Sequence, residues 1–236
     1  MNAPAVPLQR GFIVSAQEPQ AAVNLEGEGG LSPQQASAVV ITCSALLREI
    51  LAICRANGWS HIQPLCLSSE LHNRPEKIPG AVKELIDAAK QKDQQIFVAY
   101  GDCGTGGLLD RMLEEEGVER IPGAHCYEFF SGGERFASFH ESEPGTFYLT
   151  DFLVRHFDRL VIRGLGLDKK PELEPLYFGN YRKLLYMAQG DDPQLKTQAK
   201  AAAQRLGLEF VYHHVGHGDM ESALERFNQR IEVALI

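Results

Sequence analysis

The chain is 236 residues long, with an apolar content of 44% and a charged content of 23%. These values exclude a disordered chain and suit one large domain, or one domain with an inserted subdomain. The formal net charge of −8 disfavours nucleic acids and anionic membrane surfaces as partners.

Nothing in the sequence directs the chain to a membrane or out of the cell. No apolar run approaches the length of a membrane span. Residues 1–10 lack the basic start and apolar core of a secretory signal. We therefore expect a cytoplasmic protein, whose five cysteines serve as thiols, metal ligands or catalytic groups rather than as disulfides.

The start of the chain differs in composition from the rest. Residues 1–37 are rich in Gly, Pro, Gln, Ala and Glu, which is typical of a flexible arm. We expect a single α/β domain over residues 38–236, with an insertion at residues 130–192. The predicted fold is a Rossmann-like parallel sheet of about five strands, with helices on both faces and a helical or irregular insertion before the last strand.

Apolar runs and helical periodicity predict the individual elements. Strands are expected at residues 38–44, 61–67, 96–100, 118–121 and 209–214. Helices are expected at residues 45–57, 80–92, 108–116, 193–206 and 219–229. The pattern also turns helical from residue 146, and a further long helix is expected from residue 171 through residue 186.

A glycine-rich turn joins the third predicted strand to its helix. It reads YGDCGTGG over residues 100–107 and is neither a Walker loop nor a GxGxxG fingerprint. Such a turn can be simply tight, with Cys103 as an inert buried thiol. Its backbone amides could also hold a phosphate or carboxylate at the helix N-terminus. The cofactor-binding candidates are Gly101, Gly104, Thr105 and Gly106, with Asn73 from the preceding loop.

Soft metal ligands follow several predicted strands. Cys43 ends the first strand, His72 lies in the loop after the second, and Cys103 follows the third. His125 and Cys126 come after the fourth, either of the two being a candidate ligand. The carboxyl ends of parallel strands lie along one edge of a sheet, where ligands bind. Thiolate and imidazole suit zinc or an iron–sulfur cluster, so the metal candidates are Cys43, His72, Cys103 and Cys126.

The remaining cysteines and histidines are weighed against these. Cys54 and Cys66 fall on apolar faces and are interpreted as core residues. Three histidines close the last predicted strand and are expected at the same sheet edge: His213, His214 and His217. No CxxC pair occurs, so the metal signal is of intermediate strength.

A metal-free alternative uses the same loops. Cys103 at a helix N-terminus could be a nucleophile with a depressed pKa. His125 would then be its base, and Asp102 or Glu128 the acid that orients the base.

Aromatic residues are dense over residues 146–189. Aromatic side chains dominate buried cores, and the simplest interpretation is packing. The sharper hypothesis is that Tyr177, Asn180 and Tyr181 form a lid over the site and contact the cofactor.

Six segments together resemble one bacterial and archaeal family, the domain of unknown function 1638. The segments are ITCSAL (41–46), LHNRPEKIP (71–79), YGDCGTGG (100–107), IPGAHCYEF (121–129), EPGTFYLTDF (143–152) and YFGNY (177–181). The resemblance implies an association with corrinoid proteins and methyltransferases, and hence one-carbon, methyl-group or corrinoid-linked metabolism. It supplies no catalytic residue.

Three functions remain open at this point. The first is a metal-binding α/β enzyme, with zinc, an iron–sulfur cluster or a corrinoid as cofactor and a small molecule as substrate. The second is a non-catalytic metallochaperone or accessory protein for a methyltransferase. The third is a metal-free cysteine-nucleophile enzyme. The partners considered are a small-molecule substrate, a corrinoid protein, a methyltransferase and a second copy of this chain.

Overall fold

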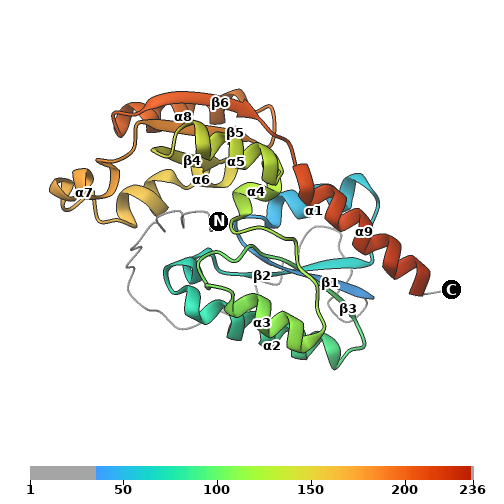
Figure 1. Cartoon of the computed structure of the whole chain (residues 1–236). Coiled ribbons are helices and arrows are strands. Elements are labelled where there is room, and N and C mark those ends of the chain that lie inside the picture. The colour runs from blue at the N-terminus through green and yellow to red at the C-terminus, as the bar shows by residue number, and fades with distance from the viewer. Residues whose placement is uncertain (1–35, 235–236) are drawn as a thin grey trace.

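Two parallel sheets, each with its own core, organise the computed structural model, which describes residues 36–234. We call the parts built on them the first and second lobes (Figure 1). The flexible arm predicted for residues 1–37 lies, up to residue 35, outside the described residues. Within the described chain, no helix combines the length and apolar character that a bilayer crossing needs.

The first lobe has three strands in the order β2-β1-β3, all parallel. They are β1 (Ala38–Cys43), β2 (Ile62–Leu67) and β3 (Gln95–Ala99). Every residue of β1 is buried, as expected for the central strand of a parallel sheet covered on both faces. The helices are α1 (Leu47–Ala56), α2 (Ile78–Lys90), α3 (Leu108–Glu116) and α9 (Gly218–Ala234). Figure 1 shows α2 and α3 on one side of the sheet and α1 and α9 on the other.

The second lobe has three parallel strands in the order β4-β5-β6. They are β4 (Thr146–Thr150), β5 (Lys183–Ala188) and β6 (Glu209–His214). Alternate side chains point to opposite faces, so Phe147, Leu149 and Tyr186 join one core while Tyr148 and Met187 join another. The first of these cores is covered by α6 (Asp151–Arg155), α7 (Glu174–Phe178) and α8 (Pro193–Arg205), and the second by α5 (Gly133–Ser142).

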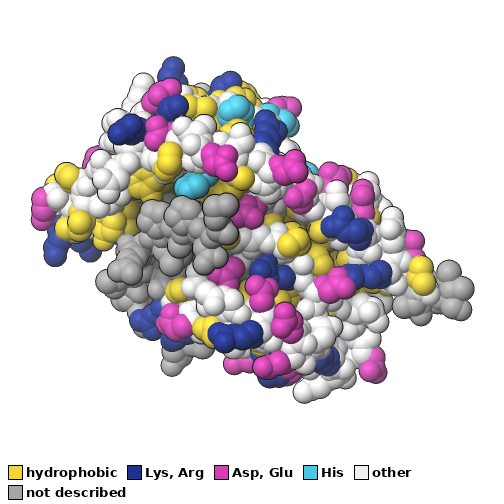
Figure 2. Space-filling model, viewed as in Figure 1, with side chains coloured by type: hydrophobic (Ala, Val, Ile, Leu, Met, Phe, Trp, Pro, Cys, Tyr) yellow, Lys and Arg dark blue, Asp and Glu magenta, His cyan; other side chains and the backbone are white. Residues whose placement is uncertain are grey.

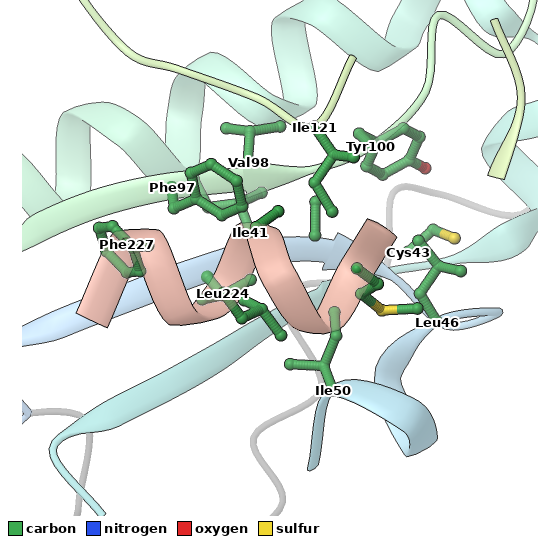
Figure 3. Close-up of a cluster of buried hydrophobic side chains, with 14 of the residues drawn as sticks. Ile41, Cys43, Leu46, Ile50, Phe97, Val98, Tyr100, Ile121, Leu224 and Phe227 are labelled. Carbon is green, nitrogen blue, oxygen red and sulfur yellow. The ribbon is translucent and has the colours of Figure 1, made fainter. Parts of the chain in front are cut away.

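The C-terminal helix returns the chain to the first lobe. After β6, α9 packs against β3, α1 and α4 (Cys126–Ser131). Phe227 of α9 stacks on Phe97 of β3 with ring centroids 5.2 Å apart, and Leu224 lies in the same cluster (Figure 3). The first lobe therefore depends on both the start and the end of the described chain.

The single five-stranded sheet predicted from the sequence is wrong, although the α/β class and the parallel pairing are confirmed. Two segments predicted to be helical are helical only in part. The first begins with β4 at Thr146 and becomes helical in α6 and in a π-helix over Asp158–Arg163. The second contains α7 but ends in β5, Lys183–Ala188. These runs are short and apolar, and periodicity alone cannot separate a buried strand from a buried helix at that length. The insertion predicted to be helical or irregular thus contains two strands of the second sheet.

The strand predicted at residues 118–121 is reduced to one bridge between Val98 and Arg120. The Arg120 guanidinium donates to the carbonyl oxygens of Ile121 and Gly123 and pairs with Asp110. Because those carbonyls are already satisfied by a side chain, and Pro122 lacks an amide hydrogen, the ladder does not extend. The helices predicted at residues 45–57, 80–92, 108–116, 193–206 and 219–229 and the last strand are confirmed within a few residues.

Candidate functional site

The glycine-rich turn after β3 is built around Asp102. Its carboxylate accepts hydrogen bonds from the Thr105 hydroxyl and from the amides of Gly106 (3.1 Å) and Gly107 (2.8 Å). Burial raises the pKa of Asp102, but these hydrogen bonds outweigh it and hold the pKa below its usual value. The carboxylate thus stabilises the turn, and the two glycine amides it binds are occupied rather than free for a phosphate.

The turn presses against the segment that leads into α4. The amides of Asp102 and Cys103 donate to the carbonyls of Gly123 (3.1 Å) and Ala124 (2.9 Å). A Cβ atom on Gly101 would lie only 3.1 Å from the His125 Cα and 3.3 Å from the Cys103 Sγ. This close approach requires glycine, and it brings the Cys103 side chain to the start of α4.

Cys103 has a backbone conformation that is uncommon for a residue with a side chain. Its φ is +48°, in the left-handed region. The nearby backbone of Cys126 and of Gly101 lowers the pKa of its thiol, against the larger opposite effect of burial. A non-glycine residue held at positive φ is often found at functional sites, because the surrounding structure must compensate for its cost.

Three thiols from three separate segments come together at this edge of the first sheet, and we call them the thiol cluster: Cys43, Cys103 and Cys126. Cys43 ends β1, Cys103 follows β3 and Cys126 begins α4. A charge on Cys103 raises the pKa of Cys43, and charges on Cys103 and Cys43 raise the pKa of Cys126. These electrostatic interactions bring Cys43, Cys103 and Cys126 into one neighbourhood, while the shared site predicted for Cys103 and Cys126 stays a prediction.

Burial is the largest influence on all three thiols. It raises the pKa of Cys103 to about 12 and the pKa values of Cys43 and Cys126 well above their ordinary value. Each is therefore a neutral thiol near pH 7 unless a cation stabilises its thiolate.

Tyr100 lies among these thiols and is 1% exposed. Its hydroxyl has no hydrogen-bond partner within residues 36–234. Charges on Cys43, Cys103 and Cys126 would each raise its pKa, after the larger effect of burial. Figure 3 shows the ring at the same end of the core as Cys43. An unpartnered buried hydroxyl is costly, and it marks a place where a ligand can supply the missing bond.

His72 completes the group around Tyr100. Its ring stacks on the Tyr100 ring with centroids 5.7 Å apart. Its Nδ1 lies 3.0 Å from the Ser69 carbonyl oxygen, so this nitrogen carries the hydrogen and Nε2 is left as an acceptor. Burial lowers the pKa of His72, which keeps the ring neutral. A ring nitrogen that donates to a backbone carbonyl is the usual arrangement for a histidine that binds metal through its other nitrogen.

His125 and Glu128 flank Cys126 in the sequence, but they are not arranged as a base and its orienting acid beside Cys103. Burial lowers the pKa of His125, whose ring lies 6.3 Å from that of Tyr127. Glu128 accepts a hydrogen bond from the Ala124 amide at 3.2 Å. Among the hydrogen bonds of residues 36–234, none joins His125 to Cys103. The catalytic roles predicted for His125, Asp102 and Glu128 stay predictions.

Other predicted site residues lie in the second lobe, and one has a side chain that the structure does not describe. Tyr177 and Tyr181 pack against the second lobe's core, and Asn180 is exposed. A charge on Tyr181 would contribute to raising the pKa of Tyr127, whose ring stacks on Tyr148 of the second lobe. The lid remains a prediction. The side chain of Asn73 lies outside what the structure describes.

The histidines at the end of the last strand do not share a sheet with the thiol cluster. β6 belongs to the second sheet, where His213 packs on Phe139 and His214 lies 3.3 Å from Asp191. Cys54 and Cys66 are buried in the first lobe, and burial raises the pKa of each to about 11.

The cluster is not a preformed metal cage. Within the part of the chain described, no three His, Cys, Asp or Glu side chains are placed so that they could hold a metal ion as they stand. Binding a metal would require a side-chain rotation that brings the sulfurs to bonding distance. The chemistry of the donor set fits zinc or iron–sulfur ligation, whereas its geometry in this structure does not.

Sequence reasoning missed the aromatic and acidic residues near the lobe junction. Tyr100 and Tyr127 directly adjoin predicted site residues, and that adjacency was the available signal. Asp151 lies in the segment EPGTFYLTDF, which resembles the family, whereas Glu49 sits in the predicted helix at residues 45–57 with no signal of its own.

The comparisons with known proteins give a family without a function. Residues 66–224 match the family described as protein of unknown function (DUF1638). The resemblance drawn from the sequence motifs is thereby confirmed. The match includes His72, Cys103 and Cys126, while Cys43 precedes it. No curated protein matches the chain, and no solved structure matches it.

Proposed function

The chain belongs to the DUF1638 family, and from that premise we propose that it is a metal-binding α/β enzyme whose Cys43, Cys103 and Cys126 hold zinc or an iron–sulfur cluster. His72 is the fourth donor when no substrate is bound. A substrate group that replaces the imidazole would meet a metal held by thiolates, at the carboxyl edge of a parallel sheet.

The convergence of three buried thiols is the observation that carries this proposal. Side chains from β1, the turn after β3 and the start of α4 interact at one place. As thiols they are weak hydrogen-bonding groups, and as thiolates they would repel one another. A bound cation removes that repulsion and lowers the pKa of each ligand, because a metal deprotonates a coordinating thiol.

The orientation of His72 supports its place in the donor set. Its Nδ1 is bound to the Ser69 carbonyl, so the lone pair of Nε2 is available. The stacking on Tyr100 fixes the plane of the ring beside the thiol cluster.

The nucleophile alternative is less well supported. A cysteine nucleophile acts as its thiolate, yet burial raises the pKa of Cys103 to about 12. The carboxylate of Asp102, one candidate for the orienting acid, is already bound to Thr105 and the amides of the turn. The alternative of an accessory protein that delivers metal uses the same ligands as the enzyme.

The reaction class is proposed from the family resemblance alone. Methyl-group or corrinoid-linked chemistry requires a soft metal or an activated thiolate, and the thiol cluster supplies donors of that kind. A small-molecule substrate, a corrinoid protein and a methyltransferase are the partners that this chemistry implies.

Elemental analysis of protein purified without oxygen tests the proposal. We expect about one equivalent of zinc, or iron with sulfide, in the wild type. Cys103→Ser and Cys126→Ser should each lose most of the metal, because a hydroxyl is a poor ligand for a soft metal. Cys54→Ser is the matched control, since it makes the same change at a buried cysteine outside the cluster. Full metal content in both cluster variants, or a metal-free wild type, would overturn the assignment.

A further inference from the structure

A cavity of about 640 Å³ lies between the outer edge of the first sheet and α9, and we call it the α9 cavity. β3 is an edge strand of this sheet, and within residues 36–234 the chain beyond it adds only the single bridge at Arg120. The cavity is lined by Phe97 of β3, by residues 119–122 and by one face of α9 between Ala223 and Val233. Sites for small molecules commonly have volumes of about 300–1,000 Å³, so this cavity is large enough to be one.

The most buried part of the lining is apolar. Phe97, Ile121 and Ala223 are each at most 4% exposed. Val233, which also lines the cavity, is 74% exposed. Figure 2 shows hydrophobic surface beside Lys and Arg side chains in the part of the molecule where Figure 1 places α9. Covering apolar surface is favourable, so the apolar body of a ligand would be stabilised here.

The polar part of the lining is predominantly cationic. It includes Arg120, Arg226 and Arg230, and Glu119 is the only acidic residue among the described residues that line the cavity. Arg120 pairs with Asp110, and Arg230 pairs with Glu119. Arg226 has neither a hydrogen-bond nor an ion-pair partner among residues 36–234. The cavity therefore keeps one unpaired positive charge, on a chain whose net charge is −8.

A neutral donor lies beside this charge. Gln229 follows Arg226 by three residues on α9, so the two side chains are neighbours on one face of the helix, and both line the cavity. The side-chain amide of Gln229 also has no hydrogen-bond partner within the described part of the chain. Neither side chain is engaged in holding the fold together, so their N–H groups are available to a ligand.

From these observations we propose that the α9 cavity binds a small organic carboxylate with an apolar body. The carboxylate accepts hydrogen bonds from the Arg226 guanidinium, whose fork of N–H groups matches two oxygens, and from the Gln229 amide. The apolar body covers Val233 and the buried apolar lining. A sugar phosphate or polyphosphate fits less well, because its polar body would meet apolar side chains. The cavity shares no residue with the thiol cluster, and the proposal does not rest on the proposed metal.

Binding of 4-phenylbutyrate to the full chain tests the proposal. Saturation-transfer NMR should show saturable binding, and the midpoint of thermal unfolding should rise with the ligand concentration and then level off, because a ligand that binds only the folded state stabilises it. 4-Phenylbutanol has the same body without the charge, and acetate has the carboxylate without the body. Neither should bind saturably over the same concentration range.

Two pairs of variants locate the binding. Arg226→Gln should weaken the binding of 4-phenylbutyrate about tenfold or more, because it removes the charge-assisted pair. Arg111→Gln is its matched control, since Arg111 is an exposed arginine of α3 that also has no partner among the described residues. Val233→Asn should weaken binding about fourfold, the equivalent of one buried methylene group. Leu176→Asn is its control, at a side chain of α7 that is 76% exposed.

Unliganded Arg226→Gln should unfold at the wild-type temperature, since Arg226 has no partner within residues 36–234, so a loss of binding would not reflect a loss of folding. Saturable binding of inorganic phosphate without binding of 4-phenylbutyrate would overturn the proposal. So would a wild type that binds 4-phenylbutyrate by neither method, equal binding of 4-phenylbutanol, or wild-type affinity in Arg226→Gln.

Discussion

The two lobes share one plan, three parallel strands with helices alongside, but the buried polar groups that follow β3 and β4 differ in how they are satisfied. In the second lobe, Asp151 is bound by Tyr186 and Gln189, and the Gln189 side chain in turn binds the Asp151 amide at 2.7 Å. In the first lobe, the Tyr100 hydroxyl has no partner within the described chain. Closed polar networks stabilise a fold, whereas unpartnered groups mark a place for something else to bind.

The charged side chains on the face drawn in Figure 2 give no such contrast. On the face shown in Figure 2, Lys and Arg side chains are interspersed with Asp and Glu, in line with the net charge of −8. The difference between the lobes lies in buried groups, and this is why it depends on the tertiary structure rather than on composition.

The largest expected effect is a loss of stability in the first lobe that the second lobe does not share. Phe227→Ala removes the side chain that joins α9 to β3 through the stack on Phe97. Loss of a buried phenylalanine costs about 3–5 kcal/mol, and we expect this loss in the first lobe. Trp59, the only tryptophan of the chain, packs against the first lobe's core, so its fluorescence reports on that lobe during urea unfolding.

Hydrogen exchange of the β5 amides reports on the second lobe in the same variant. If the lobes unfold as separate units, the opening free energy from exchange of the β5 amides should fall less than the unfolding free energy reported by Trp59. An equal loss in both lobes would show that α9 couples them into one cooperative unit, contrary to the comparison made above.

A smaller effect is expected at the contact between the turn and α4. Gly101→Ala places a Cβ atom 3.1 Å from the His125 backbone, and relieving such overpacking costs about 1–3 kcal/mol. The same shift should move Cys103 from the other thiols and reduce the metal content of the protein. Gly80→Ala is the control, because Gly80 lies in α2 with open space around it and alanine there should stabilise by about 0.5–1 kcal/mol.

Urea unfolding and metal analysis of the two alanine variants test this contrast, because Gly101→Ala should lower the free energy of unfolding and Gly80→Ala should raise it. If Gly101→Ala were as stable as the wild type and kept its metal, the close approach of the turn and α4 would not position the site.

The first lobe could be predicted from the sequence because its signals are local. Each of β1, β2 and β3 is an apolar run followed by a polar turn and an amphipathic helix. The rule that carboxyl ends of parallel strands share an edge then placed Cys43 and Cys103 at one edge, whereas the strand from which Cys126 was placed is reduced to a single bridge. The predicted and observed elements of this lobe agree because strands and helices repeat their buried positions at different spacings in the sequence.

The second lobe could not be predicted in the same way. β4 has five residues, Thr146–Thr150, all buried, and is too short for periodicity to identify it, although its Thr, Phe and Tyr residues favour a strand. Its identity as a strand comes from pairing with β5, which lies far along the chain.

The smallest expected effect concerns the pH dependence of stability at Glu49. Burial, followed by the charge of Asp151, raises the pKa of Glu49 in the folded state. A raised folded-state pKa favours the folded protein below the unfolded pKa of about 4.3 and ceases to do so as the pH rises through the folded value. The wild type should therefore match Glu49→Gln near pH 4 and become less stable than Glu49→Gln above it. We expect a gap of about 1 kcal/mol by pH 8, the low end of the cost of an unsatisfied buried group, because the Glu49 Oε2 has no hydrogen-bond partner among the described residues. Urea unfolding of both proteins across this range measures the gap, with Glu84→Gln, at an exposed position of α2, as the reference. A constant difference from pH 4 to pH 8 would mean that Glu49 titrates as it does in the unfolded chain.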